Sequence, residues 1–426
     1  MSDSVGGLEG RIEAVHSLAR LNGLDFPPVR FEICPADVIY TLGAYGMPTR
    51  FGHWSFGKAY QKLKTQYEYN LIHIYELVIN SVPCYAFLLE GNSLVQNQLV
   101  AAHVFGHADF FRHNCRLAAA SSLMVESMAA SAERIRSYEF RYGARRVEAF
   151  LDDVMSLQEQ IDPWPPRGGA LLPQKDLLLF LAQNARDLDD WQRDIITSLR
   201  EEMLYFWPQF ETRIMNEGWA TFWHTRLMRQ ADLVPRDALE FARLHAKVTQ
   251  PVRTALNPYL VGLRIFEDLE RRYGLEKVFE AREVETDLSF IRNYLTRELV
   301  AELDLYLYRR MEGRWQVAER DPGKVRDTLV ESLVNAGHPY IVVQDGDYQR
   351  TGGLYLRHVY EGRPLDLRHL EKTLQHLYRI WGRPVYLETV VAGKTEIFSF
   401  DGQRNNRTPA ESGPRGASPA APPGAS

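Results

Sequence analysis

The spacing of the apolar residues constrains the fold of this chain most strongly. In many stretches between residue 8 and about residue 318, apolar side chains recur every three or four positions, which is the period of an α-helix with one buried face. Residues 57–80 and 93–135 keep this period over long stretches, and Pro and Gly mark many of the joints between such stretches. We therefore expect a mainly α protein, with a large helical domain over residues 1–318.

The pattern changes near residue 320. Residues 338–362 form two β-rich stretches with Asp-Gly and Gly-Gly turn signals between them, and residues 384–400 fit a second hairpin. Residues 365–382, between the two hairpins, fit one amphipathic helix. This β-β-α-β-β order predicts a small α+β domain over residues 319–401. Residues 402–426 are rich in Pro, Ser, Ala, Gly and Asn, and they predict a disordered tail.

Charge and composition exclude several classes of protein. The formal net charge is -5 and the sequence has no run rich in Lys and Arg, so we expect no nucleic-acid partner. The cysteines lie far apart, which argues against a disulfide framework and against a cysteine zinc knuckle. No window approaches about 18 uncharged apolar residues, and the first residues do not resemble a secretion signal. We expect a cytoplasmic protein without stable membrane insertion.

The string AAHVFGHADFFRHN contains two histidines at a spacing that suits a metal ion. His103 and His107 are four residues apart in a helical stretch, so they lie on one helix face about 40° apart. Zinc-protease helices bind their ion with two histidines at this spacing. Taken alone, the pair also has a structural interpretation, in which one imidazole packs in the core and the other is exposed.

The string NEGWATFWH contains a second pair of possible ligands. Glu217 and His224 are seven residues apart, which places them within about 20° of each other on a helix. Gly218 costs about 1 kcal/mol relative to Ala inside a helix, which indicates a packing or site demand. The structural alternative is a glutamate that complements the helix dipole and a histidine bonded to a neighbour.

Together these strings predict a zincin-like pair of helices that holds a divalent metal ion. The predicted ligands are His103, His107, Glu217 and His224, and zinc is the expected ion, although iron and manganese accept the same ligands. The position after the first histidine, where helical zinc hydrolases carry their general base, is Val104.

A substitute general base has to come from elsewhere in the chain. Glu76, which shares an expected helix face with His73, is one candidate, and Glu201 or Glu202 is another. An unpaired carboxylate at Glu76 would be costly to bury, so a hydrogen-bonded structural role is an equal alternative. Three functions stay open: a metal-dependent hydrolase, a non-catalytic protein with a structural metal, and a two-metal carboxylate protein.

Several longer strings resemble the stage V sporulation protein R (SpoVR) family. They are FGHWSFGK, YELVINSVPCYAFLLEGNSL, AAHVFGHADFFRHN, REEMLYFWPQFETRIMNEGWATFWH, NPYLVG and DLSFIRNYLT. The resemblance implies a role in sporulation, at spore-cortex formation, or in a stress response where the host does not sporulate. It also implies a serine kinase of the PrkA type and a von Willebrand A-like protein as partners. The family resemblance does not imply a molecular activity, so the chemistry rests on the residues.

Overall fold

The computed structural model describes residues 2–68, 76–165, 173–252, 255–311 and 313–410. The chain forms two compact units, which we call the first unit (1–144 and 201–338) and the second unit (145–200 and 339–426). The prediction of a mainly α protein with a small α+β domain is confirmed.

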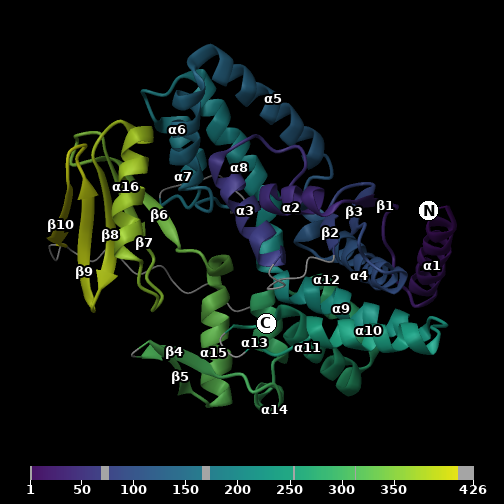
Figure 1. Ribbon diagram of the computed structural model, residues 1–426. Coiled ribbons are helices and arrows are strands. Elements are labelled where there is room, and N and C mark those ends of the chain that lie inside the picture. The colour runs from purple at the N-terminus through teal and green to yellow at the C-terminus, as the bar shows by residue number, and fades with distance from the viewer. Residues whose placement is uncertain (1, 69–75, 166–172, 253–254, 312, 411–426) are drawn as a thin grey trace. The chain divides into compact units, whose positions relative to one another are not determined.

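The first unit is built mostly from helices (Figure 1). They are α1 (Ser2–Leu21), α2 (Ala36–Tyr45), α3 (Trp54–Glu68), α4 (Leu94–His113), α5 (Met124–Tyr142), α9 (Arg213–Gln230), α10 (Pro235–Val248), α11 (Pro258–Tyr273), α12 (Leu275–Val284), α13 (Asp287–Tyr294), α14 (Arg297–Glu302) and α15 (Pro322–Leu333), with 3-10 turns at Leu117–Ala119 and Val334–Gly337. In the part of the chain that the structure describes, none of the helices is both long and apolar enough to cross a membrane.

The first unit also contains strands that the apolar spacing did not predict. Strands β1 (Val29–Cys34), β2 (Glu76–Ile79) and β3 (Cys84–Leu89) form a sheet of order β1-β3-β2, and β4 (Leu307–Met311) pairs with β5 (Arg314–Glu319). The helix expected over residues 57–80 is therefore wrong at its end, because Glu76–Ile79 pairs antiparallel with β3. A short apolar run fits a buried strand as well as a helix, so its spacing alone could not decide.

The helix expected over residues 93–135 is divided in two. Helix α4 begins at a capping box formed by Ser93 and Gln96, and it ends at Asn114, whose backbone is extended. The Asn114 side chain donates hydrogen bonds to the carbonyl oxygens of Arg282 and Glu285. These bonds tie the end of α4 to the end of α12, which a local sequence pattern cannot indicate.

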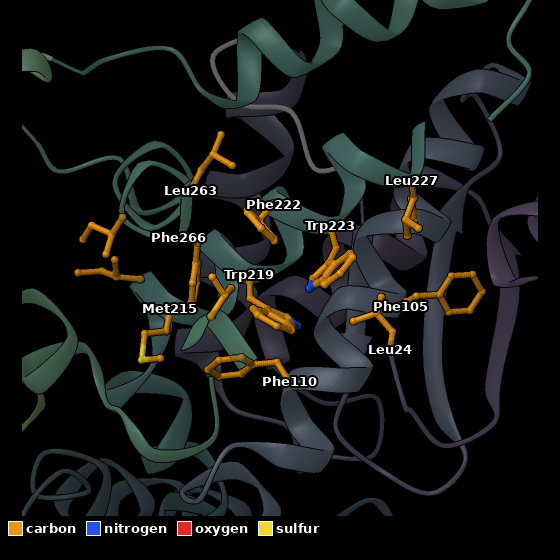
Figure 2. Close-up of a cluster of buried hydrophobic side chains, with 14 of the residues drawn as sticks. Leu24, Phe105, Phe110, Met215, Trp219, Phe222, Trp223, Leu227, Leu263 and Phe266 are labelled. Atoms are coloured by element: carbon orange, nitrogen blue, oxygen red, sulfur yellow. The ribbon is translucent and has the colours of Figure 1, made fainter. Parts of the chain in front are cut away.

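The core of the first unit is aromatic and lies around α9 (Figure 2). Trp219 and Trp223 are completely buried, and Trp219 makes edge-to-face contacts with Phe266 and with Trp223 at centroid distances of 5.4 and 5.6 Å. Each large aromatic side chain removes apolar area from water, at about 25 cal/mol per Å². This packing holds α9 between α4 and α11, the arrangement that positions the site described below.

The second unit contains the predicted β-β-α-β-β order. Its elements are α6 (Ala144–Met155), α7 (Leu177–Asn184), the first part of α8 (Asp190–Glu211), β6 (Ile341–Tyr348), β7 (Gly353–His358), α16 (Leu367–Trp381), β8 (Val385–Val391), β9 (Lys394–Phe400) and β10 (Asn405–Pro409). The strands form one sheet of order β10-β9-β8-β7-β6, and α16 packs along β8 and β9 (Figure 1). Strands β7 and β8 are parallel, as expected for strands joined through a helix.

The domain boundary differs from the predicted one. The unit that contains the sheet also includes residues 145–200, and its second segment begins at residue 339. The sequence pattern had instead predicted a separate domain from residue 319. Asp153 on α6 explains the difference, because its carboxylate accepts hydrogen bonds from His376 and Arg379 on α16. His376 and Asp153 are 223 positions apart in the sequence, so local periodicity cannot indicate that they pair.

The tail also differs from the prediction in its first residues. Strand β10 pairs antiparallel with β9, with Asn405 opposite Phe400 and Pro409 opposite Glu396, and Arg407 forms an ion pair with Glu396. The prediction of disorder from residue 402 onward is therefore wrong for the residues of β10. The rest of the predicted tail, residues 411–426, lies outside the described residues. Composition underestimated this segment because β-pairing satisfies its backbone without a large apolar side-chain contribution.

Candidate metal centre

Three of the four predicted ligands converge in the first unit. His103 and His107 project from α4, and Glu217 projects from α9. The Nε2 atom of His103 lies 3.5 Å from Oε2 of Glu217, and the Nε2 atom of His107 lies 3.6 Å from the same oxygen. One ligand atom from each of the three residues lies within 4.8 Å of the other two.

Small residues allow the two helices to approach closely enough for this convergence. Gly106 lies between the two histidines, and a Cβ atom added there would be 2.7 Å from Cα of Ala220. Since real Cβ atoms do not approach another carbon so closely, any larger residue at position 106 would separate α4 from α9. The strings that carry the ligands thus also carry the contact that brings them together.

The distances around Glu217 fit a shared ion better than a direct contact. Separations of 3.5 and 3.6 Å exceed the usual 2.7–3.2 Å of an N–H···O hydrogen bond. Ligand atoms around one zinc ion lie roughly 3–4 Å from each other, since each is about 2.0–2.2 Å from the metal. The Oε2 atom of Glu217 is shielded from solvent and makes no hydrogen bond to any described residue. An orphaned buried oxygen of this kind fits a metal ligand.

The Nδ1 atom of each candidate ligand histidine has a polar partner. Nδ1 of His107 lies 2.8 Å from Oδ1 of Asn216, and this amide oxygen can only accept, so His107 carries its proton on Nδ1. Nε2 of His107 is then left with its lone pair toward Glu217, which is the form that binds a metal ion. Nδ1 of His103 lies 2.9 Å from Nδ1 of His224.

The electrostatics of the site suit metal binding. Burial, together with the nearby His103, lowers the pKa of His107 to about 4 in spite of Glu217 and Asn216, so this imidazole is neutral at pH 7. Burial alone would raise the pKa of Glu217, but the contact with His103, the nearby imidazole of His107 and a hydrogen bond from Tyr259 together lower it. A neutral imidazole and an ionised carboxylate are the required ligand forms.

His224 does not face the space between the other three residues. It contacts Nδ1 of His103, on the opposite edge of the ring from the Nε2 atom that faces Glu217. An ion bound by Nε2 of His103 is therefore out of reach of His224 as a fourth ligand. Its position is that of a hydrogen-bonding partner of His103, the alternative role expected for it.

The structure brings neither Glu201 nor Glu202 into this group. Glu202 is buried and accepts a hydrogen bond of 2.7 Å from Nε of Arg50, and burial raises its pKa in spite of this guanidinium. Glu201 is exposed. Glu76 lies in β2 and not on a helix, and its side chain and all of His73 lie outside the described residues. The helix-face argument for Glu76 with His73 is therefore wrong.

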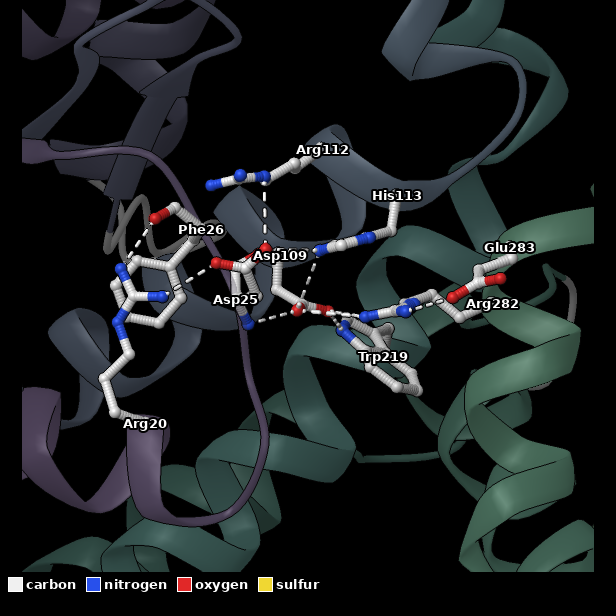
Figure 3. Close-up of polar contacts among 9 residues, drawn as sticks. All are labelled: Arg20, Asp25, Phe26, Asp109, Arg112, His113, Trp219, Arg282 and Glu283. Carbon is white, nitrogen blue, oxygen red and sulfur yellow. Dashed lines mark hydrogen bonds and ion pairs between the residues drawn. The ribbon is translucent and has the colours of Figure 1, made fainter.

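A buried ionic network lies along the same two helices (Figure 3). Asp109, two residues after His107, is completely buried and accepts hydrogen bonds from Nη1 of Arg282, from Nε1 of Trp219 and from the backbone N–H of Asp25. Its carboxylate thus connects α4 with α9, α12 and the segment after α1. Because Trp219 is two residues after Glu217, the network also links the two helices that carry the candidate ligands.

Sequence reasoning missed three residues of this site. Asn216 orients His107, Tyr259 hydrogen-bonds to Glu217, and His245 on α10 lies 3.1 Å from Nε2 of His224 through its Nδ1 atom. Asn216 stands next to Glu217 inside NEGWATFWH, and its polarity in that aromatic string was a usable signal. Tyr259 stands in NPYLVG, a string that indicated the family resemblance but no site residue, and nothing in the spacing indicates His245.

Comparisons with known proteins agree with the resemblance described above. The family model for SpoVR like protein matches residues 3–170 and 168–338, and that for the SpoVR-like C-terminal domain matches residues 339–392. The protein YcgB of Escherichia coli strain K12, described as uncharacterized, is 28% identical over 467 aligned positions, which cover 89% of this chain and 91% of YcgB. No solved structure matches.

Proposed function

This chain belongs to the SpoVR family, and we propose that it is a metal-dependent hydrolase acting on an amide or peptide-type bond, in sporulation or a stress response. His103, His107 and Glu217 hold the ion. The observation that carries the proposal is the position of His224 behind His103, because three protein ligands leave a coordination position open. Structural zinc sites have four protein ligands, whereas catalytic sites keep one position for water or substrate.

The residues of the chain prepare this site. Asn216 fixes the tautomer of His107, and Tyr259 holds the carboxylate of Glu217 by a hydrogen bond. A divalent ion, zinc in the first instance, would lower the pKa of a bound water and polarise the carbonyl of a substrate. The ligands come from rigid helices rather than loops, which keeps their geometry fixed while the substrate is exchanged.

One observation favours a second candidate function. Val104 stands where a general base is usual, and Glu202 is engaged by Arg50. General bases contribute about 100- to 10,000-fold in rate, so hydrolysis without one is slow. The alternative is a non-catalytic partner of a PrkA-type kinase and a von Willebrand A-like protein, with a metal that only stabilises the fold.

The test compares three purified proteins: wild type, His103→Ala, and His113→Ala as the matched control. His113 is also on α4, but its ring donates to the carbonyl oxygen of Asp25, outside the candidate centre. Metal content is measured by elemental analysis, and a panel of peptides and cell-wall peptides is examined by mass spectrometry. The hydrolase proposal expects metal and cleavage products in wild type and His113→Ala, and neither in His103→Ala.

Other outcomes separate the two candidates. Metal without any cleavage, lost together with stability in His103→Ala, supports the structural alternative. Rapid, metal-dependent degradation of unfolded casein would show that a general base is present after all, contrary to the argument from Val104.

A further inference from the structure

Three imidazoles lie in a row from the candidate metal centre toward the outside of the first unit. Nδ1 of His103 is 2.9 Å from Nδ1 of His224, and Nε2 of His224 is 3.1 Å from Nδ1 of His245. His103 and His224 are buried, whereas His245 on α10 is partly exposed. We call this row the imidazole chain.

In a chain of neutral imidazoles, the donor-to-acceptor direction of one hydrogen bond determines the direction of the next. Each ring has one N–H donor and one acceptor nitrogen, so the tautomer of one ring determines that of the next. At 2.9 and 3.1 Å, each contact in the chain joins two ring nitrogens, so one nitrogen of each contact donates and the other accepts.

The direction in the metal-free protein follows from Glu217. Its buried Oε2 atom makes no hydrogen bond to a described residue, and it faces the Nε2 atoms of His103 and His107. His107 keeps its proton on Nδ1, because Asn216 can only accept it. Only His103 can therefore turn an N–H toward Glu217. Its Nδ1 atom then accepts from His224, and His224 in turn accepts from Nδ1–H of His245.

We propose that binding of a divalent cation at Nε2 of His103 reverses every hydrogen bond of the imidazole chain, so that His245 is a positioning residue for the metal site. This inference rests on the proposed metal site. A metal ion at Nε2 of His103 requires the proton on Nδ1, which donates to His224. Nε2–H of His224 then donates to Nδ1 of His245, whose own proton moves to Nε2.

The proton balance of the reversal is closed. The proton on Nε2 of His103 leaves to solvent when the cation binds, and one proton enters from solvent at Nε2 of His245. Between these ends, one proton passes from His245 to His224 and one from His224 to His103. Each ring keeps one proton throughout, so the net charge of the imidazole chain does not change.

The contrast between the two ligand histidines supports this role. The outer partner of His107 is an amide oxygen, which presets the metal-binding tautomer. The outer partner of His103 is another ring, which can donate or accept. Thr225 Oγ1, 3.5 Å from Nδ1 of His245, donates its own proton to the carbonyl oxygen of Thr221, so it does not compete as a donor.

The direct test is the tautomer of His245 in the full-length wild-type protein. Ring ¹⁵N shifts of histidine-labelled protein are recorded without metal and with one equivalent of Zn²⁺, and the His245→Asn spectrum identifies the His245 signals. We expect His245 to change from the Nδ1–H to the Nε2–H tautomer when Zn²⁺ binds, and His107 to remain Nδ1–H. Binding of Zn²⁺ at His103 and His107 with no change at His245 overturns the inference.

Variants give an independent measurement. His245→Leu leaves Nε2–H of His224 without its acceptor, and we expect Zn²⁺ affinity to fall about 10-fold, as when outer partners of ligand histidines are removed. His245→Asn restores an acceptor oxygen and should bind Zn²⁺ within about 2-fold of wild type. Equal weakening by both variants overturns the inference. A wild-type protein that binds no Zn²⁺ at all would instead refute the proposed metal site.

Discussion

Gly218 on α9 and Gly262 on α11 touch through their backbones, because a Cβ atom added to Gly218 would lie 2.4 Å from Cα of Gly262. The reverse is also true, since a Cβ atom at Gly262 would lie 2.3 Å from the carbonyl oxygen of Ile214. Gly218 in NEGWATFWH thus lies at a helix-crossing point, which explains why a poor helix former stands next to Glu217.

The first prediction concerns this crossing. Gly262→Ala should destabilise the protein by at least about 2 kcal/mol, since neither backbone can move without separating α9 from α11. Gly57→Ala is the control, because Gly57 is in α3 with open space around its Cβ position, and it should be neutral or stabilising by up to about 1 kcal/mol. Denaturant unfolding measures both. Equal stability of the two variants would contradict the crossing.

The second prediction concerns the metal. Zn²⁺ at about 100 times its dissociation constant should raise the unfolding free energy of wild type by about 2.7 kcal/mol, because only the folded chain presents the site. His107→Ala should lose this increase, and a chelator should remove it from wild type. The control His113→Ala should keep it. Thermal unfolding with and without Zn²⁺ measures the shift, and an increase that persists in His107→Ala would exclude His107 as a ligand.

The third prediction concerns Asp287, which caps α9 from another helix by accepting the backbone N–H groups of Ile214 and Met215. Burial raises the pKa of Asp287 to about 7, although these hydrogen bonds and Arg213 oppose the rise. A folded-state pKa above the unfolded value stabilises the protein at low pH, and this stability is lost as pH rises through about 4 to about 7.

In the wild-type protein, this effect should lower the unfolding free energy between about pH 4 and about pH 7 by at most about 4 kcal/mol. Asp287→Asn should remove this fall. Denaturant unfolding at several pH values measures it. The control is Asp321→Asn at the exposed cap of α15, which should leave the pH profile unchanged. A wild-type profile that is flat, or that rises with pH as strongly as in Asp287→Asn, would contradict the role of Asp287.

The fourth prediction concerns the buried pair of Asp109 and Arg282. Arg282→Met leaves the carboxylate of Asp109 buried without its cation, and it should cost about 3–5 kcal/mol of stability. The matched exposed pair is Arg136 with Glu133, both 71% exposed at the side chain, and Arg136→Met should cost less than about 1 kcal/mol. Denaturant unfolding distinguishes them, and a similar cost for both would mean that Asp109 is not held by Arg282.

The fifth prediction concerns β10. Truncation after Asp401 removes the strand that covers the edge of β9, together with the Arg407–Glu396 ion pair, so the melting temperature should fall. Truncation after Ala410 retains β10 and is the control. Differential scanning calorimetry compares both with the full chain. An unchanged melting temperature after the first truncation would support a dispensable tail from residue 402.

The sequence by itself determined several features that depend on local period. Helical spacing placed His103 with His107 on one face and made Glu217 a candidate, and the change near residue 320 indicated the β-β-α-β-β order. Local spacing specifies which side chains share a face, because the period of the backbone is set by neighbouring residues.

Only the tertiary structure decided how these faces are used. The orientation of His103 depends on His224, 121 residues away, and that of His107 depends on Asn216, 109 residues away. Glu202 pairs with Arg50, which is 152 residues away in the sequence, and not with the candidate metal centre. Such hydrogen bonds form between groups that packing brings together, so a period of two or 3.6 residues along the chain cannot encode them.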